Sequence, residues 1–127
     1  MKKLFTILFS FVVLSLSAQE VNSCYVQKKK SVKMMSKLNQ NLAHYSFHDV
    51  KNVLKSIQER EGNSAQVFDI YALINWLKDD KVQAEFYASK TIKLCSEEFS
   101  TSNYILSVIN YDLRNYQLSV DYMEKAI

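Results

Sequence analysis

The chain has 127 residues, of which 48% are hydrophobic and 23% are charged, and this is enough for one folded domain. It contains no proline and one glycine, Gly62, so the tight turns of an all-β protein are poorly supplied, and a glycine-rich phosphate loop is excluded. The formal charge is +3, but loss of Lys2 and Lys3 with the N-terminal segment described next leaves 14 basic against 13 acidic side chains. A balance of +1 gives no support for binding to nucleic acid.

The N-terminal segment, residues 1–19, has the features of a secretory signal peptide. Lys2 and Lys3 precede an almost uninterrupted apolar run at residues 4–16, and Ser17-Ala18-Gln19 offers small residues for cleavage. The run is shorter than the ~20 residues of a membrane span. We therefore expect export to the periplasm or to the outside of the cell, with residues 20–30 as a lead-in to the folded part. The exact cleavage point stays open, and an uncleaved anchor is the alternative.

The two cysteines, Cys24 and Cys95, have alternative fates. An oxidising compartment permits a disulfide. However, the two lie in very different parts of the chain, and a bridge needs Cα atoms within roughly 7 Å, so the sequence argues against pairing without deciding the question. Val21-Asn22-Ser23-Cys24 loosely resembles a lipobox, which makes lipid attachment at Cys24 the other alternative. We expect membrane association only through that lipid or an uncleaved signal.

From residue 31 onward apolar residues recur with helical spacing, which predicts an all-α fold. The pattern predicts six helices in three hairpins, at about residues 31–62, 64–98 and 100–127. Turns are expected at Ser46, at Gly62 with Ser64 capping the next helix, at Asp79-Asp80 and at Arg114-Asn115.

A cluster of lysines marks the start of the first predicted helix. No acidic residue occurs between these lysines and Asp49, and the cluster consists of Lys28, Lys29, Lys30, Lys33 and Lys37. A solvated helix face is the simpler interpretation, and a dock for acidic partners or lipid headgroups is the alternative.

The segment 68–92 repeats at 103–127, after a shift of 35 residues. A period in the mid-thirties is typical of stacked helix pairs. Small residues at Ala72, Ala84, Ser107 and Ser119 would let the paired helices approach closely. The identical pairs are Ile74 with Ile109, Asn75 with Asn110, Tyr87 with Tyr122, Lys90 with Lys125, and Ile92 with Ile127.

Residues 115–127 resemble the second helix of a tetratricopeptide repeat, through Tyr116, Ser119, Tyr122 and Lys125-Ala126-Ile127. The middle repeat matches at Ala84, Tyr87 and Lys90-Thr91-Ile92, and the first repeat only at Phe47, Val50 and Leu54. The glycine usual between the two helices is replaced by Asp79 and by Arg114, and the closing proline is missing. The resemblance, to exported bacterial members of the family, implies a short right-handed solenoid of stacked hairpins.

That resemblance also implies a function, because the first helix of each such repeat lines a concave groove that holds a protein or peptide. Carried over to this chain, the groove positions are Asp69, Leu73, Trp76, Tyr104, Val108 and Tyr111, with Met35, Asn39 and Leu42 for the first repeat. Placement of these aromatic residues in the core is the alternative. We expect a protein or peptide partner, no nucleic acid and no specific small molecule.

No catalytic arrangement is evident in the sequence. His44 and His48 are four residues apart, but a turn falls between them and no zinc-protease glutamate follows His44. We therefore expect no enzyme, no cofactor and no metal. The last predicted helix lacks a polar capping helix, and two alternatives follow: the helix self-associates, or the chain is a fragment of something longer. The alternative function is the N-terminal sensory or interaction portion of a longer periplasmic signalling protein.

Overall fold

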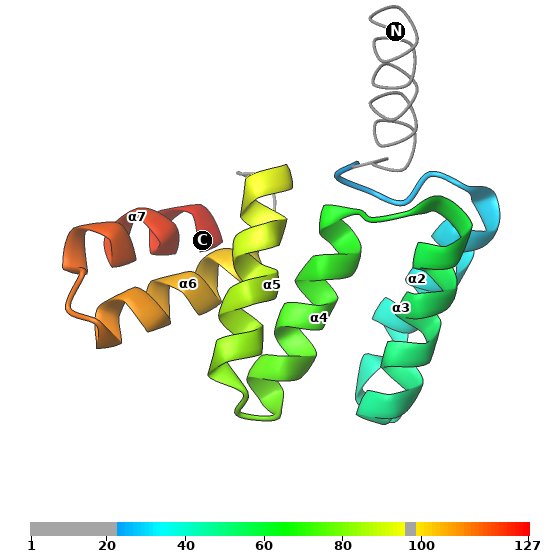
Figure 1. Ribbon diagram of the computed structural model, residues 1–127, viewed down its shortest axis with the longest axis horizontal. Coiled ribbons are helices and arrows are strands. Elements are labelled where there is room, and N and C mark those ends of the chain that lie inside the picture. Colours follow the sequence, from blue (N-terminus) through cyan, green and yellow to red (C-terminus); the bar gives the residue numbers. More distant parts are fainter. Residues whose placement is uncertain (1–22, 96–98) are drawn as a thin grey trace, which may run out of the picture.

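The computed structural model describes residues 23–95 and 99–127 (Figure 1). The helices are α2 (Lys29–Gln40), α3 (Phe47–Glu61), α4 (Ala65–Leu77), α5 (Lys81–Leu94), α6 (Ser100–Asp112) and α7 (Tyr116–Ala126), with a 3-10 turn η1 (Leu42–His44). The described residues contain no strand, so the predicted all-α class and the six helices are confirmed. The predicted signal peptide, the first part of the lead-in and residues 96–98 of the second predicted hairpin lie outside the described residues.

Three of the four predicted turns contain a side chain that caps the next helix by binding a free backbone amide, and the turn before α7 does not. Ser46 caps α3 by accepting from the Asp49 amide at 3.1 Å, and Ser64 caps α4 by accepting from the Val67 amide at 3.2 Å. Asp80 does the same for α5. Gly62, with φ of 82°, ends α3 in a conformation that costs glycine little. The predicted cap at Ser64 and the stop at Gly62 are therefore confirmed.

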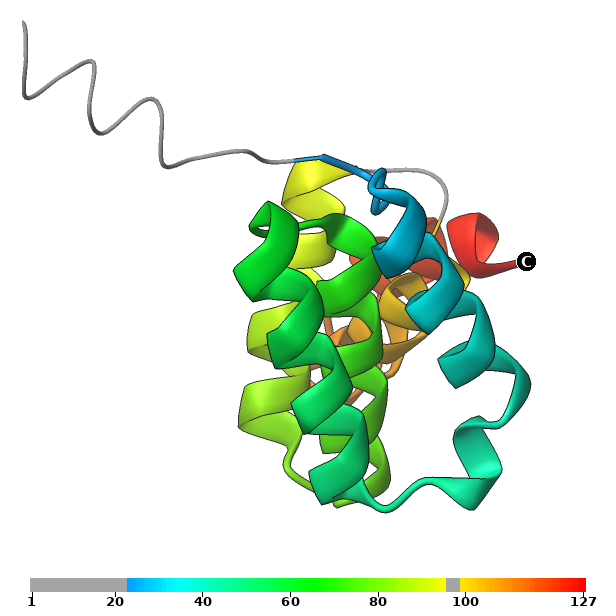
Figure 2. The same cartoon turned by 90° about the vertical axis from the view of Figure 1, so that its right-hand side faces the viewer.

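Helices that follow one another in the sequence also pack together in space, and α6 touches α4 as well as α5. Figures 1 and 2 show α2 and α3 beside α4, and α6 with α7 inclined steeply to α4 and α5. One buried apolar cluster joins α2, α3 and α4, and a second joins α4, α5 and α6. Tyr87 on α5 packs against both clusters, so it connects the two halves of the core.

The repeat of 35 residues found in the sequence is also present in the backbone structure. Helices α4 and α6 begin and end 35 residues apart, and α5 and α7 begin 35 residues apart. The turns match bond for bond: the Asp80 amide donates to the Asn75 carbonyl, and the Asn115 amide to the Asn110 carbonyl. The hairpin α4–α5 and the hairpin α6–α7 therefore share one local geometry.

Small residues lie where the two helices of each hairpin pack together, as predicted. Ala72 and Ala84 are fully buried and belong to the same cluster. Ser107 and Ser119 are also buried, and each hydroxyl lies 2.8 Å from the other residue's carbonyl oxygen. These bonds satisfy two hydroxyls that burial would otherwise leave unpaired.

Each of the two turns contains one residue in the left-handed backbone conformation. Asp79 has φ of 61° and Arg114 has φ of 64°, a region that costs an L-residue roughly 1–2 kcal/mol. Asp79→Gly and Arg114→Gly are each expected to raise the free energy of unfolding by about 0.5–1 kcal/mol, because glycine removes that strain at some cost in chain entropy. Urea denaturation measures the change. Lys78→Gly is the control, since φ is −83° there and glycine should destabilise. Equal effects at residues 78 and 79 would contradict the strain argument.

Candidate protein-binding surface

Three of the six predicted groove residues line one open pocket of about 450 Å³, here called the groove pocket. Leu73 and Trp76 reach it from α4 and are half-buried, whereas Tyr104 reaches it from α6 and is 47% exposed. The pocket is mainly apolar and aromatic, which suits an apolar side chain of a partner. Its lining consists of Leu73, Trp76, Ser100, Thr101, Tyr104, Ile105, Met123, Ala126 and Ile127.

The other three predicted residues do not line this pocket. Asp69 accepts hydrogen bonds from the Ser102 amide at 3.0 Å and from the Ser102 hydroxyl, so it holds the first turn of α6. Burial raises the pKa of Asp69, although these two bonds act in the opposite direction. Tyr111 is 62% exposed and lies edge-on to Tyr116, with ring centroids 5.4 Å apart. Val108 is half-buried on α6.

Sequence reasoning missed the wall that α7 contributes through Met123, Ala126 and Ile127. The repeat offered a signal for it. Met123 is 35 residues after Ala88, and Ala88 is fully buried in the cluster that joins α5 to α6. In the described chain no further helix packs on α7 as α6 packs on α5, so the equivalent side chains of α7 remain accessible.

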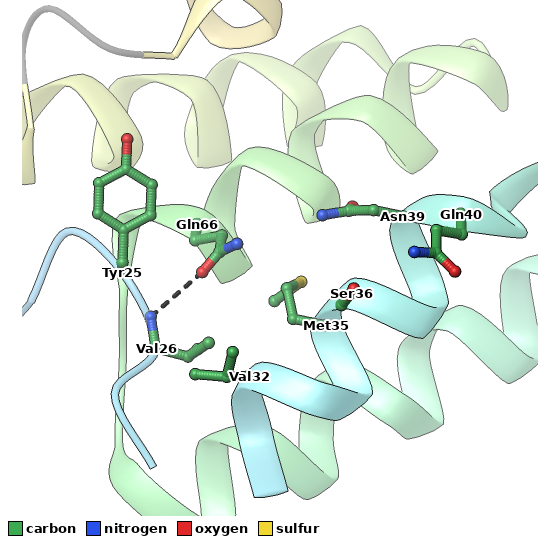
Figure 3. Close-up of a pocket in the computed structure, with 8 residues that line it drawn as sticks. All are labelled: Tyr25, Val26, Val32, Met35, Ser36, Asn39, Gln40 and Gln66. Carbon is green, nitrogen blue, oxygen red and sulfur yellow. Dashed lines mark hydrogen bonds between the residues drawn. The ribbon is translucent and has the colours of Figure 1, made fainter. Parts of the chain in front are cut away.

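A second pocket, of about 500 Å³, lies between the described part of the lead-in that precedes α2 (residues 23–28), α2 itself and the start of α4 (Figure 3). We call it the lead-in pocket. Met35 and Asn39, two of the positions suggested for the first repeat, line it, and Leu42 does not. Figure 3 shows the side chains of Val26 and Val32 facing each other and Asn39 extending toward the same space. The full lining is Tyr25, Val26, Val32, Met35, Ser36, Asn39, Gln40 and Gln66.

The lead-in is held in place by hydrogen bonds to two helices. The carbonyls of Ser23 and Cys24 accept from the Ala65 and Gln66 amides, both at 2.9 Å, at the free N-terminus of α4. The Val26 amide donates to the Gln66 side chain at 3.2 Å, as Figure 3 shows. This wall is built from backbone groups, so the sequence pattern did not predict it.

Glu61, at the end of α3, fixes the other end of the lead-in. Its carboxylate accepts from the backbone amides of Gln27 at 2.7 Å and Lys28 at 3.1 Å. Burial acts to raise the pKa of Glu61, but these bonds and the Lys28 charge outweigh it, so the pKa is lowered. The Glu61 charge is thus directed at the start of α2.

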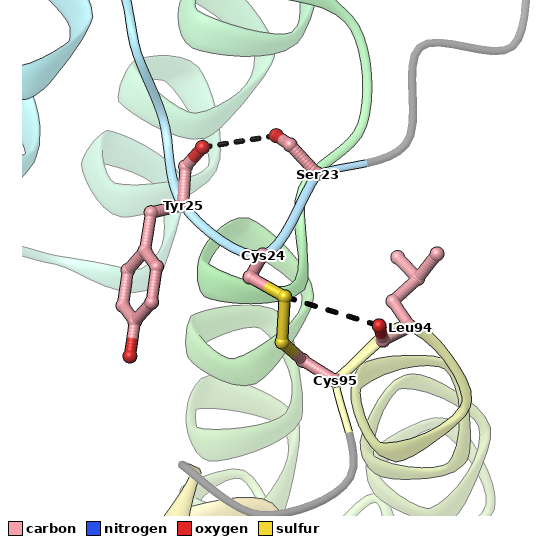
Figure 4. The surroundings of a disulfide bond; sticks show 5 residues. All are labelled: Ser23, Cys24, Tyr25, Leu94 and Cys95. Atoms are coloured by element: carbon pink, nitrogen blue, oxygen red, sulfur yellow. Dashed lines mark hydrogen bonds between the residues drawn. A yellow bond between two sulfur atoms is a disulfide. The ribbon is translucent and has the colours of Figure 1, made fainter.

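Cys24 and Cys95 form a disulfide with Cα atoms 5.6 Å apart (Figure 4). The sequence argument against pairing was therefore wrong. The bridge forms because the hydrogen bonds that the Ser23 and Cys24 carbonyls accept place the lead-in at the N-terminus of α4, and the antiparallel α5 ends there too. A sulfur in a disulfide cannot carry a thioether-linked lipid at the same time, which removes lipid attachment from the oxidised protein.

An aromatic cluster supports α4 and α5 on another side. The Tyr71 and Tyr87 rings stack with centroids 4.9 Å apart, and the Tyr71 hydroxyl donates to Gln58 at 3.0 Å. Burial, with a smaller effect from Tyr87, raises the pKa of Tyr71 to about 12. The Lys90 ammonium lies 4.6 Å from the Phe86 ring centroid. These contacts show that Tyr71, Tyr87 and Phe86 serve in the packing of α4 and α5.

The described residues contain no group of three or more His, Cys, Asp or Glu side chains placed to hold a metal ion. His48 instead lies 3.2 Å from the Asn52 side-chain amide. None of the helices in the described ranges is long and apolar enough to span a membrane. Comparison of the chain with protein-family models, with curated proteins and with solved structures found no match.

Proposed function

We propose that this protein is an exported scaffold that binds a segment of a partner protein in the groove pocket. The observation that carries the proposal is the meeting of Leu73, Trp76 and Tyr104 in one open pocket. These side chains come from α4 and α6, the first helices of two hairpins with the same geometry. Large aromatic side chains that are half-exposed in a pocket are typical centres of protein binding.

The arrangement of the hairpins supports a tetratricopeptide-like, right-handed solenoid as the scaffold. Three features repeat after 35 residues: the residue at which each helix begins, the residue with a left-handed conformation in the turn, and the buried small residues where the two helices pack together. In such arrays each hairpin stacks on its neighbour, and the first helices line the surface that holds ligands. An amphipathic or aromatic-bearing segment would fit the apolar groove pocket better than a purely charged tail.

Export rests on the predicted signal peptide and agrees with the disulfide, because such bonds persist in oxidising compartments. Intact-mass measurement of the chain isolated from the cell envelope tests it. We expect a chain that begins after residue 17, 18 or 19. A full-length chain in the cytoplasm would contradict export and leave the binding proposal standing.

Binding is tested by substitution in the groove pocket. The partner is first identified by cross-linking to the wild-type chain, and its dissociation constant is then measured by calorimetry. Trp76→Ala and Tyr104→Ala are each expected to weaken binding about tenfold or more, since buried aromatic contacts are the usual hot spots.

Tyr111→Ala is the matched control, because Tyr111 is on the same helix as Tyr104 and exposed, but outside the pocket. Circular dichroism should be unchanged in all three variants. Loss of helix content in Trp76→Ala or Tyr104→Ala would show that the ring supports the core instead. Equal weakening by Tyr111→Ala would place binding elsewhere.

A further inference from the structure

We propose that the lead-in pocket is a second binding site, and that it recognises an acidic segment of a partner protein carrying an apolar side chain. The proposal does not depend on the groove pocket, because the two pockets share no lining residue. It rests on the shape of the lead-in pocket, the charge around its rim and the chemistry of its walls.

Helix α2, which forms one side of the pocket, carries positive charge on every turn. This helix carries Lys29, Lys30, Lys33 and Lys37, all exposed, and no acidic residue. Val32 follows Lys29 by three residues, and Ser36 follows Lys33 by three, and residues three apart are neighbours on a helix surface. Because Val32 and Ser36 line the pocket, Lys29 and Lys33 lie beside its opening.

The acidic side chains near the pocket are already used within the protein. Glu61 binds the amides of Gln27 and Lys28 at the start of α2. Asp69, one turn beyond Gln66 on α4, binds the amide and hydroxyl of Ser102. Lys28 donates to the Arg60 carbonyl, so it is held at the edge of the cluster. The lysines of α2 therefore face solvent without an acidic neighbour on their own helix, and a ligand of opposite charge complements them.

The walls of the pocket favour a peptide over a membrane surface. Asn39, Gln40 and Gln66 bring side-chain amides, which donate to and accept from a peptide backbone. Val26 and Val32, whose side chains face each other in Figure 3, add an apolar part of the lining that suits one aliphatic side chain. A concave site of about 500 Å³ holds a side chain and its neighbouring backbone, whereas a flat lipid surface leaves it unfilled.

The test uses the oxidised protein and a blocked synthetic peptide that repeats Glu-Leu-Glu, with a Gln-Leu-Gln peptide as the neutral control. We expect calorimetric binding of the acidic peptide only, weakening as salt increases. The double variant Lys29→Glu/Lys33→Glu should reduce affinity at least about tenfold, because two attractions become repulsions. Val32→Ser should also weaken binding, because it removes an apolar side chain from the pocket lining. Val32 is 46% exposed, so the substitution should leave the core intact.

The matched control is Lys51→Glu/Lys55→Glu on α3, which makes the same change in net charge at two exposed positions four residues apart and outside the pocket. It should bind nearly as the wild type does. Equal weakening by this control, or equal binding of the glutamine peptide, would overturn the site. Binding to phosphatidylglycerol vesicles in place of the acidic peptide would overturn it in favour of a membrane surface. Variants Trp76→Ala and Tyr104→Ala should bind the acidic peptide normally.

Discussion

Removal of the Cys24–Cys95 disulfide is expected to lower the free energy of unfolding by about 4 kcal/mol. The two cysteines are separated by 71 residues, and closing a loop of that length restricts the unfolded chain by roughly this amount. The bridge also joins the lead-in to the end of α5, so it spans helices α2 to α5. Urea denaturation with and without reductant measures the loss, and Cys24→Ser/Cys95→Ser should reproduce it.

The double variant is its own control, because reductant should not change its stability. Hydrogen exchange adds a local measurement: the Ala65 and Gln66 amides, which donate to the lead-in, should lose more protection than amides of α6. Equal stability of the oxidised and reduced protein would contradict the prediction and show that hydrogen bonds alone hold the lead-in.

Leu54→Ala is expected to destabilise the protein by about 2–5 kcal/mol. Leu54 is fully buried on α3, in the cluster that joins α2, α3 and α4, and its truncation leaves a cavity. Chemical denaturation gives the loss directly. The first hairpin should be affected most, because this cluster is its main connection to α4.

Leu77→Ala is the matched control, since Leu77 at the end of α4 is 61% exposed and its truncation should change stability by less than about 0.5 kcal/mol. Similar losses in the two variants would mean that α3 is not packed as described. A lower denaturant slope in Leu54→Ala alone would indicate that the first hairpin unfolds before the rest.

Much of the fold was predictable because it depends on local chemistry. Helical spacing, the cap at Ser64 and the stop at Gly62 act over a few residues, and each was read correctly. The repeated turn is also local, although Asp79 and Arg114 adopt the left-handed conformation that glycine adopts more easily. The first predicted helix was less accurate, because α2 ends at Gln40 and Leu42 lies in η1.

The candidate groove was predictable only in part. The 35-residue alignment placed Leu73, Trp76 and Tyr104 on corresponding helices, and all three line the groove pocket. It could not show that Asp69 turns toward Ser102, because that bond depends on how α6 meets α4. It also missed Met123, whose exposure depends on the absence of a covering helix in the described chain.

The sequence by itself determined the all-α class, the turns between most of the helices and the internal repeat, because periodicity and capping are properties of neighbouring residues. Only the tertiary structure decided the course of the lead-in, the Cys24–Cys95 bridge and the lead-in pocket. Backbone amides of α4 and the carboxylate of Glu61 hold the lead-in against α4 and α3 by hydrogen bonds. Those groups carry no pattern in the sequence, and their effect appears only when distant segments meet.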